Sequence, residues 1–291
     1  MDTVNTKPRT IARIVAAIDA MEGDGMRIRR AFPTYALADL DPFLLLDHLG
    51  PITFQPGEAK GFPDHPHRGF EAVTYVLEGA MQHRDSFGHH GILGPGSVQW
   101  MTAGSGLVHS EMPGEEFAKN GGTLHGFQLW VNLPRANKMS PPRYQEYSGD
   151  KIPAVLGDGV TVKVVAGAAL GQQGIIETNI PISYLHVTLE PRASFEQALP
   201  ATANAFVYVI RGVGAAGVGL ASFAEGSLVI FQKDGGVVSI NNPSERPLEF
   251  LLVAGEPIGE PVVRAGPFVM NTKQEILQAF EDYQNGLMGR I

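Results

Sequence analysis

The chain has 291 residues, of which 44% are hydrophobic and 18% are charged, so it is long enough and apolar enough to bury one or two cores. Its net charge of −8 argues against direct contact with nucleic acid or an anionic membrane, and the absence of cysteine excludes disulfides and thiolate metal sites. The 35 glycines and 21 prolines predict many turns, as is typical of an all-β protein with short strands.

The N-terminal region predicts strands and has no targeting signal. Residues 10–19 and 26–34 have strand-like patterns and flank a Gly-rich turn at 22–25. Basic residues interrupt the apolar residues before position 21, unlike in a signal peptide, and no stretch approaches the ~20 apolar residues of a membrane helix. We therefore expect a cytoplasmic protein without membrane association.

The middle of the chain continues with short strands between turns. Further strands are predicted over residues 41–50, 70–79, 94–104, 107–113 and 124–134. The polar, Pro-rich stretch 141–153 has the composition of a linker between two domains.

The second half of the chain repeats the pattern of the first half. VTYVLEGAMQ at 73–82 is similar to FVYVIRGVGA at 206–215, and PGSV at 95–98 is similar to EGSL at 225–228. The period is about 130 residues, which indicates a weak internal duplication of one barrel-like unit.

The chain ends on a predicted helix at 272–289. Thr272 and Glu275 have the spacing of a capping box, and Asn285-Gly286 is a stop signal. An apolar stripe is expected to pack on a barrel wall; it consists of Ile276, Leu277, Phe280 and Tyr283.

Two short clusters carry the main indication of function. His65 and His67 are two positions apart, and so are His109 and Glu111. On a β-strand this spacing puts both side chains of a pair on one face, so two adjacent strands would bring three imidazoles and one carboxylate to one point. Such a set suits a divalent transition metal: iron(II) is one candidate, beside manganese, nickel, cobalt, copper and zinc. An octahedral ion with four protein ligands keeps two positions open for chemistry.

The internal repeat provides a comparison for these four residues. Offsets without gaps place their counterparts in the second half at Ala198, Pro200, Ser239 and Asn241, none of which is a histidine or an acid. The strand pattern recurs without the four residues. This indicates that the first half keeps them for a site rather than for the fold.

Several segments resemble the pirin family of the cupin superfamily. They are FPDHPHRGFEAVTYVLEG, GPGSVQWMTAGSGLVHSEMP, HGFQLWVNLP and GPFVMNT with its helix, and the resemblance covers nearly the full length. It implies an all-β bicupin fold, with two double-stranded β-helix (jelly-roll) barrels packed face to face and a C-terminal helix. We expect the N-terminal metal-binding barrel at residues 1–142, and the C-terminal metal-free barrel with the helix at 143–291.

The resemblance also implies a cofactor and its ligands. Carried over by position, the pirin ligands fall on His65, His67, His109 and Glu111, and the usual metal is iron, here one Fe(II) per chain in the N-terminal barrel. Glu71 occupies the place at which many other metal cupins have a ligand glutamate. In this chain it would orient a ligand histidine or be a solvated carboxylate at a strand end.

Two functions follow from the resemblance. Some pirins resemble quercetin 2,3-dioxygenase, which opens the central ring of a flavonol with O₂ and releases carbon monoxide. The partners would be a small aromatic substrate and O₂, and Glu111 would also be the catalytic base, as the only obvious proton acceptor. The alternative is a non-enzymatic, iron-containing regulatory protein that responds to its redox state and acts through a protein partner. We prefer the enzyme because catalysis requires open metal positions. The resemblance also implies that the protein is a monomer.

Residues near the clusters are candidates for a pocket. Arg68 would hold an anionic substrate or pair with Asp64. Apolar and amide side chains would line a pocket above the metal or belong to the core; these are Phe70, Trp100, Met101 and Gln128. Trp100 and Met101 cannot both point inward from one strand.

Overall fold

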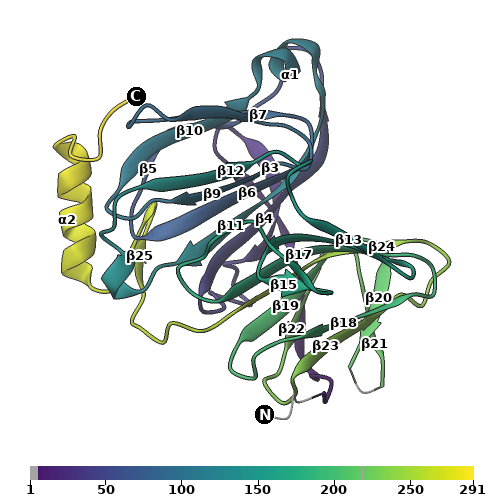
Figure 1. Ribbon diagram of the computed structural model, residues 1–291. Helices are drawn as coiled ribbons and strands as arrows, with labels where there is room; N and C mark the ends of the chain where they lie inside the picture. The colour runs from purple at the N-terminus through teal and green to yellow at the C-terminus, as the bar shows by residue number, and fades with distance from the viewer. Residues whose placement is uncertain (1–5, 218) are drawn as a thin grey trace. The chain divides into compact units, whose positions relative to one another are not determined.

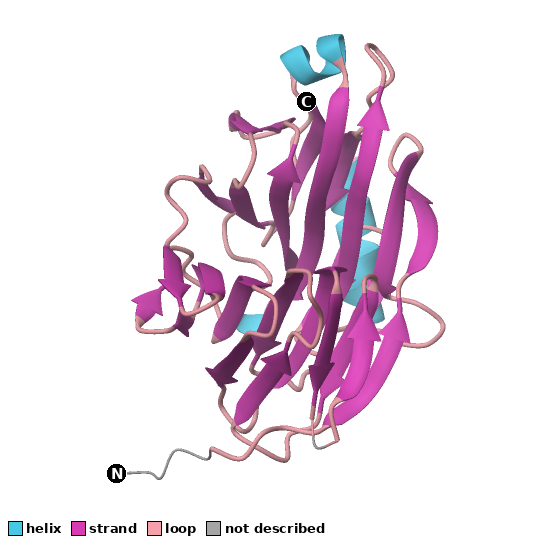
Figure 2. Cartoon of the chain, turned by 90° about the vertical axis from the view of Figure 1, so that its right-hand side faces the viewer, coloured by secondary structure: helices cyan, strands magenta, loops and turns pink. Residues whose placement is uncertain are grey.

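The computed structural model describes residues 6–217 and 219–291, and strands dominate it (Figures 1 and 2). Residues 1–5 of the predicted N-terminal barrel lie outside the described part. The chain forms two compact units. The first, here called the N-terminal barrel, consists of Ile18–Asp150 and Ile258–Ile291. The second, the C-terminal barrel, consists of the described residues up to Ala17 and of Lys151–Pro257.

The N-terminal barrel is built from two antiparallel sheets of its described residues. The larger has the order β12-β9-β6-β11-β4-β3-β2, and the smaller has the order β5-β10-β7-β8. The strands of the larger sheet are β2 (Ile18–Glu22), β3 (Met26–Phe32), β4 (Phe43–Phe54), β6 (Phe70–Glu78), β9 (Val98–Thr102), β11 (Gly122–Asn132) and β12 (Arg143–Tyr147). Those of the smaller are β5 (Phe62–His67), β7 (Met81–Asp85), β8 (His90–Leu93) and β10 (Leu107–Pro113).

The C-terminal barrel has the same strand order in the part that the structure describes. Its sheets run β1-β22-β19-β24-β17-β14-β13 and β18-β23-β20-β21. The larger contains β1 (Ile11–Ala16), β13 (Ala154–Gly157), β14 (Val160–Ala166), β17 (Ile182–Leu189), β19 (Asn204–Arg211), β22 (Ser227–Phe231) and β24 (Leu248–Gly255). The smaller contains β18 (Ser194–Ala198), β20 (Val213–Ala216), β21 (Ala221–Ala224) and β23 (Val237–Asn241). A short hairpin joins β15 (Ala168–Ala169) to β16 (Gln172–Gln173).

The shared strand order explains the repeat seen in the sequence. The similar segments at 73–82 and 206–215 lie on β6 and β19, which occupy the same place in the two larger sheets. Both strands end at a glycine with positive φ, Gly79 at 87° and Gly212 at 93°, a conformation that favours glycine. The predicted all-β fold of two jelly-roll barrels is thus confirmed.

Each end of the chain belongs to the barrel opposite to the one predicted from the sequence. β1 pairs with β22 and lies in the C-terminal barrel, whereas β25 (Val263–Ala265), β26 (Phe268–Met270) and the last helix lie in the N-terminal barrel. The predicted linker at 141–153 is wrong in its middle, because β12 pairs with β9 there. Composition alone did not show this pairing, since an edge strand tolerates polar residues and proline.

The last helix, α2 (Lys273–Gln284), is covered on one side by the N-terminal barrel (Figure 1). The predicted capping box is present, with Thr272 accepting from the Glu275 amide. Ile276 and Ala279 pack in an apolar cluster with β10 and β26. Leu277 of the predicted stripe is 62% exposed, so it is not part of that contact.

Two shorter helical segments complete the described elements, α1 (Glu115–Asn120) and the 3-10 turn η1 (Arg135–Asn137). Within the described ranges, no helix has the length and apolar character needed to cross a bilayer.

Candidate metal centre

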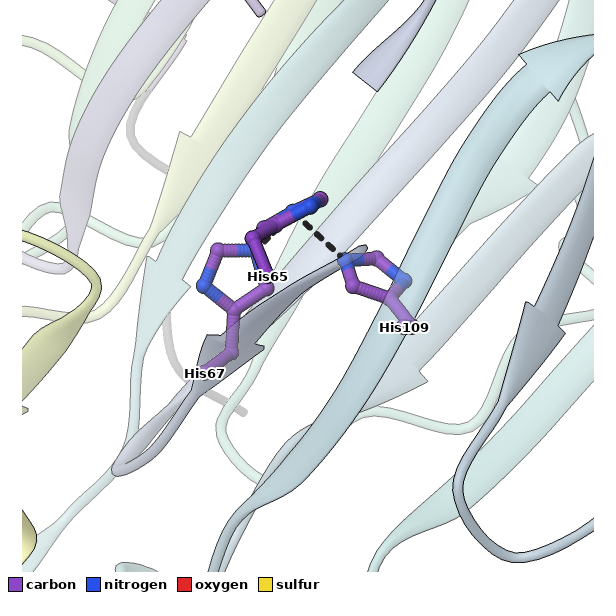
Figure 3. A group of neighbouring side chains, drawn as sticks. All are labelled: His65, His67 and His109. Atoms are coloured by element: carbon purple, nitrogen blue, oxygen red, sulfur yellow. Dashed lines mark hydrogen bonds between the residues drawn. The ribbon is translucent and has the colours of Figure 1, made fainter. Parts of the chain in front are cut away.

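Three histidines converge inside the N-terminal barrel (Figure 3). β5 and β10 are antiparallel neighbours, and their register puts His109 opposite His65, with His67 two residues further along β5. The Nε2 atom of His65 lies 3.0 Å from Nε2 of His67 and 2.9 Å from Nε2 of His109. The predicted meeting of the two clusters is therefore present for the three imidazoles.

The distances between these nitrogens fit the donor set of one octahedral ion. Nitrogen donors about 2.1 Å from a metal and at right angles to each other are about 3.0 Å apart. Nδ1 of His65 lies 2.7 Å from the carbonyl oxygen of Pro63, which can only accept, so Nδ1 carries the hydrogen and Nε2 has the free lone pair. The ring orientation is thus that of a metal ligand.

Burial favours the neutral form of two of the three histidines, His67 and His109. Burial lowers the pKa of His67 well below its ordinary value, and the charge of His65 lowers it further. Burial likewise lowers the pKa of His109, followed by the charges of His67 and His65. Neutral imidazoles are the form that metals bind.

Glu111 lies beside the cluster but is not one of its converging groups. Of the described residues, the group whose ligand atoms all lie within 4.8 Å of one another consists of the three histidines. The Glu111 carboxylate is 3% exposed and accepts from the Thr74 hydroxyl at 2.6 Å and from the Gln128 amide at 3.0 Å. Because Glu111 follows His109 by two positions on β10, both side chains lie on one face of the strand.

A cavity of about 520 Å³ opens onto His65 and His67, a size usual for small-molecule sites. His65, His67, Gln128 and Trp130 line it, together with charged side chains from β2, β3, β4 and β25. Next to His67 lies an apolar cluster that includes Phe70, Met101 and Trp130. Of the two alternatives on β9, Met101 is therefore the side chain that packs near the site.

The end of β5 is held by groups from distant parts of the chain. Arg68 donates to the carbonyl of Ser105 and forms a 2.7 Å ion pair with Asp282 of α2. The predicted pairing of Arg68 with Asp64 is wrong, because Asp64 lies against Arg84 instead. This ion pair neutralises Arg68 and binds it to α2.

Gly69 completes this support. The buried Nζ of Lys138 donates to the carbonyls of Gly69 and Val269 and to the side chain of Asn132. Burial lowers the pKa of Lys138 to about 8. The bridge ties the residue next to Arg68 to β26.

Glu71 is buried rather than solvated. It is 1% exposed, and its carboxylate accepts from the Thr102 hydroxyl at 2.6 Å. The alternative of a solvated carboxylate at a strand end is therefore wrong.

The corresponding strands of the C-terminal barrel present apolar side chains to their core. β18 and β23 pair as β5 and β10 do, and Phe195, Val238 and Ile240 from these strands belong to the main apolar cluster. Ser239, the counterpart of His109 predicted without gaps, therefore lies between two residues that face the core and is not one of them. Hydrocarbon fills the space that imidazoles occupy in the other barrel.

Comparison with known proteins agrees with this architecture. The pirin family profile matches residues 25–131, and the profile of the pirin C-terminal cupin domain matches residues 184–289. The chain belongs to the pirin family. A pirin-like protein of Solanum lycopersicum is 45% identical over 289 residues, which are 99% of this chain and 96% of that protein. Human pirin is 44% identical, over 94% of this chain and 92% of its own.

A solved structure supports the same placement. The crystal structure of a quercetin 2,3-dioxygenase from Acinetobacter baumannii superposes with a TM-score of 0.92 at 34% identity, over 98% of this pirin and 100% of that chain. The pirin fold and the two cupin domains are therefore shown for this sequence.

Sequence reasoning missed several groups of the pirin site. Gln128 and Trp130 alternate on β11, so the pattern already placed them on one face, yet only Gln128 was considered for a pocket. The sequence also showed no sign of Thr74, Arg30 and Arg264. These residues reach the site only because their strands lie next to it in the folded barrel, and no local motif marks them.

Proposed function

We propose that this pirin is a metal-dependent dioxygenase that cleaves an aromatic substrate, such as the flavonol quercetin, with O₂. The observation that carries the proposal is the convergence of three imidazole nitrogens, His65 Nε2 lying 3.0 Å from that of His67 and 2.9 Å from that of His109, beside a cavity of about 520 Å³ that His65 and His67 line. The similarity to the Acinetobacter quercetin 2,3-dioxygenase supports the choice of substrate.

His65, His67, His109 and Glu111 are the proposed ligands of one divalent cation, Fe(II) in the first instance. Such an ion would lower the pKa of a bound substrate hydroxyl and hold the substrate beside O₂. Three neutral nitrogens and one carboxylate leave the charge of a dication only partly compensated, which favours binding of an anionic oxygen.

Glu111 is also the proposed proton acceptor. It follows His109 by two positions on β10 and is buried, 3% exposed. The Thr74 hydroxyl and the Gln128 amide donate to its two oxygens and so fix the orientation of the carboxylate. A general base contributes about 10²–10⁴-fold to the rate when it is positioned in this way.

The apolar wall of the site supports an aromatic substrate. Phe70 and Trp130 lie with ring centroids 4.2 Å apart, and each contacts the His67 ring edge-on. This wall excludes water from one side of His67 and gives the cavity an aromatic lining at Trp130.

The test is oxygen uptake by the reconstituted protein. Metal-free pirin is loaded anaerobically with Fe(II), its metal content is measured, and quercetin is added in an oxygen electrode with detection of carbon monoxide. We expect about one iron per chain, in line with a single site, and carbon monoxide release with the uptake.

Two variants and one control separate the roles. His109→Ala should lose both metal and uptake, whereas Glu111→Gln should lose uptake by about 10²–10⁴-fold and keep part of the metal. His90→Ala, on an exposed edge of β8, should behave as the wild type. Wild-type protein that binds no metal would refute the ligand assignment. Stoichiometric iron without uptake would refute the dioxygenase and favour the redox-sensitive regulatory protein.

A further inference from the structure

One arginine of the cavity that His65 and His67 line forms no ion pair in the part of the chain that the structure describes. Arg264 of β25 lines the cavity together with His65, His67 and Trp130, and its residue is exposed to solvent. Its guanidinium donates to the carbonyl of Leu44 at 3.1 Å. Within residues 6–217 and 219–291, no ion pair to Arg264 is formed. Most of its five N–H donors thus remain available.

The other arginine of the cavity is bound by two carboxylates. Arg30 binds both oxygens of Asp47, at 2.8 and 2.7 Å, and also Glu22 at 2.6 Å. Hydrogen bonding to Asp47 raises the pKa of Arg30. These two carboxylates occupy Arg30. Asp64, which lines the same cavity, lies near Arg84.

Arg264 is oriented towards the interior by an aromatic ring. Its Cζ lies 4.9 Å from the centroid of Trp130, in a cation–π contact, and the same ring lies 5.2 Å from the ring of His67. Trp130 thus contacts both the histidine cluster and the arginine. His67 and Arg264 both contact Trp130, so a molecule with one aromatic ring in the cavity would reach from His67 to the guanidinium.

Arg264 lies among other charged groups but forms no ion pair within the described residues. Partial burial lowers the pKa of Arg264, and the neighbouring Arg30 lowers it further, while Asp47, Glu22 and Asp39 act in the opposite direction from longer range. A guanidinium with free N–H donors is a usual partner of a carboxylate or phenolate.

We propose that Arg264 is a specificity-determining residue that binds an acidic group of the substrate, so that the natural substrate is an aromatic acid or another aromatic anion. This inference rests on the proposed function for its account of the reaction, but the anion site itself can be measured without turnover. Metal at one end of the cavity and Arg264 at the other would hold the two ends of the same molecule.

The experiment compares two ligands that differ in one charge, 3,4-dihydroxybenzoate and its methyl ester. Their affinities are measured by calorimetry at neutral pH for Zn(II)-loaded protein and for protein without added metal. We expect the wild type to prefer the acid by about tenfold or more in both forms, and the preference to shrink with added salt. Arg264→Met should abolish the preference and leave the affinity of the ester within about twofold, as expected for loss of a charged bond alone.

Two further variants make the result specific. Arg264→Lys keeps the charge and should retain part of the preference, which also guards against a folding defect in the methionine variant. Arg211→Met removes an exposed arginine of the C-terminal barrel and should retain the full preference. A preference that persists in Arg264→Met, or no preference in the wild type, would overturn the inference. Absence of metal from the wild type would refute the proposed function and leave the measurement on metal-free protein intact.

Discussion

Gly69 provides a sharp test of how the candidate metal site is held. It follows His67 by two positions, has a φ of 87°, and a Cβ added there would lie 2.0 Å from the carbonyl oxygen of Val269. Gly88 has a φ of 90°, but a Cβ added there meets nothing within 4 Å. Gly69→Ala and Gly88→Ala therefore differ in close contact rather than in backbone conformation.

The expected losses of stability follow from the backbone strain, which both variants share, and from the close contact, which only one of them has. An L side chain in the left-handed region costs about 1–2 kcal/mol, which applies to both variants. Only Gly69→Ala must also displace the backbone of Val269, and overpacking of this kind costs a further ~1–3 kcal/mol. We expect a loss of stability of about 2–5 kcal/mol for Gly69→Ala and about 1–2 kcal/mol for Gly88→Ala. Because Lys138 bridges Gly69 and Val269, the strain also moves His67 and should weaken Fe(II) binding about tenfold or more.

The assay is urea unfolding followed by tryptophan fluorescence. Both tryptophans of the chain, Trp100 and Trp130, belong to the N-terminal barrel, so the signal reports on the unit that contains the site. Linear extrapolation gives the free energy of unfolding, and a chelator competition gives the Fe(II) affinity. Equal losses of stability in Gly69→Ala and Gly88→Ala, or equal Fe(II) affinities, would refute the reasoning.

Two other predictions concern groups around the site. Thr74→Val removes the hydroxyl that donates to buried Glu111 and should weaken Fe(II) binding about tenfold in the same competition, at a cost of about 1–3 kcal/mol in stability; an unchanged affinity would contradict its supporting role. The Gln278 amide and Arg68 hold the pKa of Asp282 below its usual value, so this carboxylate contributes stability above about pH 4 that is lost as pH falls through the lower folded-state value. Asp282→Asn should cost about 1 kcal/mol at neutral pH and flatten the acid limb of the stability profile, measured by fluorescence; an acid limb identical to that of the wild type would exclude Asp282 as its source.

Spacing along single strands was enough to predict much of the candidate site. The i, i+2 positions of His65 and His67, and of His109 and Glu111, put each pair on one face of a strand wherever that strand lies. The duplication was visible for a similar reason, because Gly79 and Gly212 both require positive φ and recur at one point of the strand pattern. The N-cap of α2 depends only on residues three positions apart.

Most of the contacts that surround the candidate site could be seen only in the tertiary structure. Arg68 pairs with Asp282, which is 214 residues away, and Arg264 reaches Trp130 from a strand near the C-terminus. Nothing in the local pattern distinguishes these arginines from exposed ones. The polar stretch around 141–153 likewise contains β12 only because β9 offers it an edge.

The sequence by itself thus determined which residue types could bind a metal, on which strands they lie, and that the chain contains two similar barrels. The tertiary structure alone decided which charges are neutralised, which arginine remains available beside the histidines, and which barrel each end of the chain joins. The physical reason is that strand periodicity and capping are local properties, whereas ion pairs and cavity walls depend on sheet register and on the path by which distant segments meet.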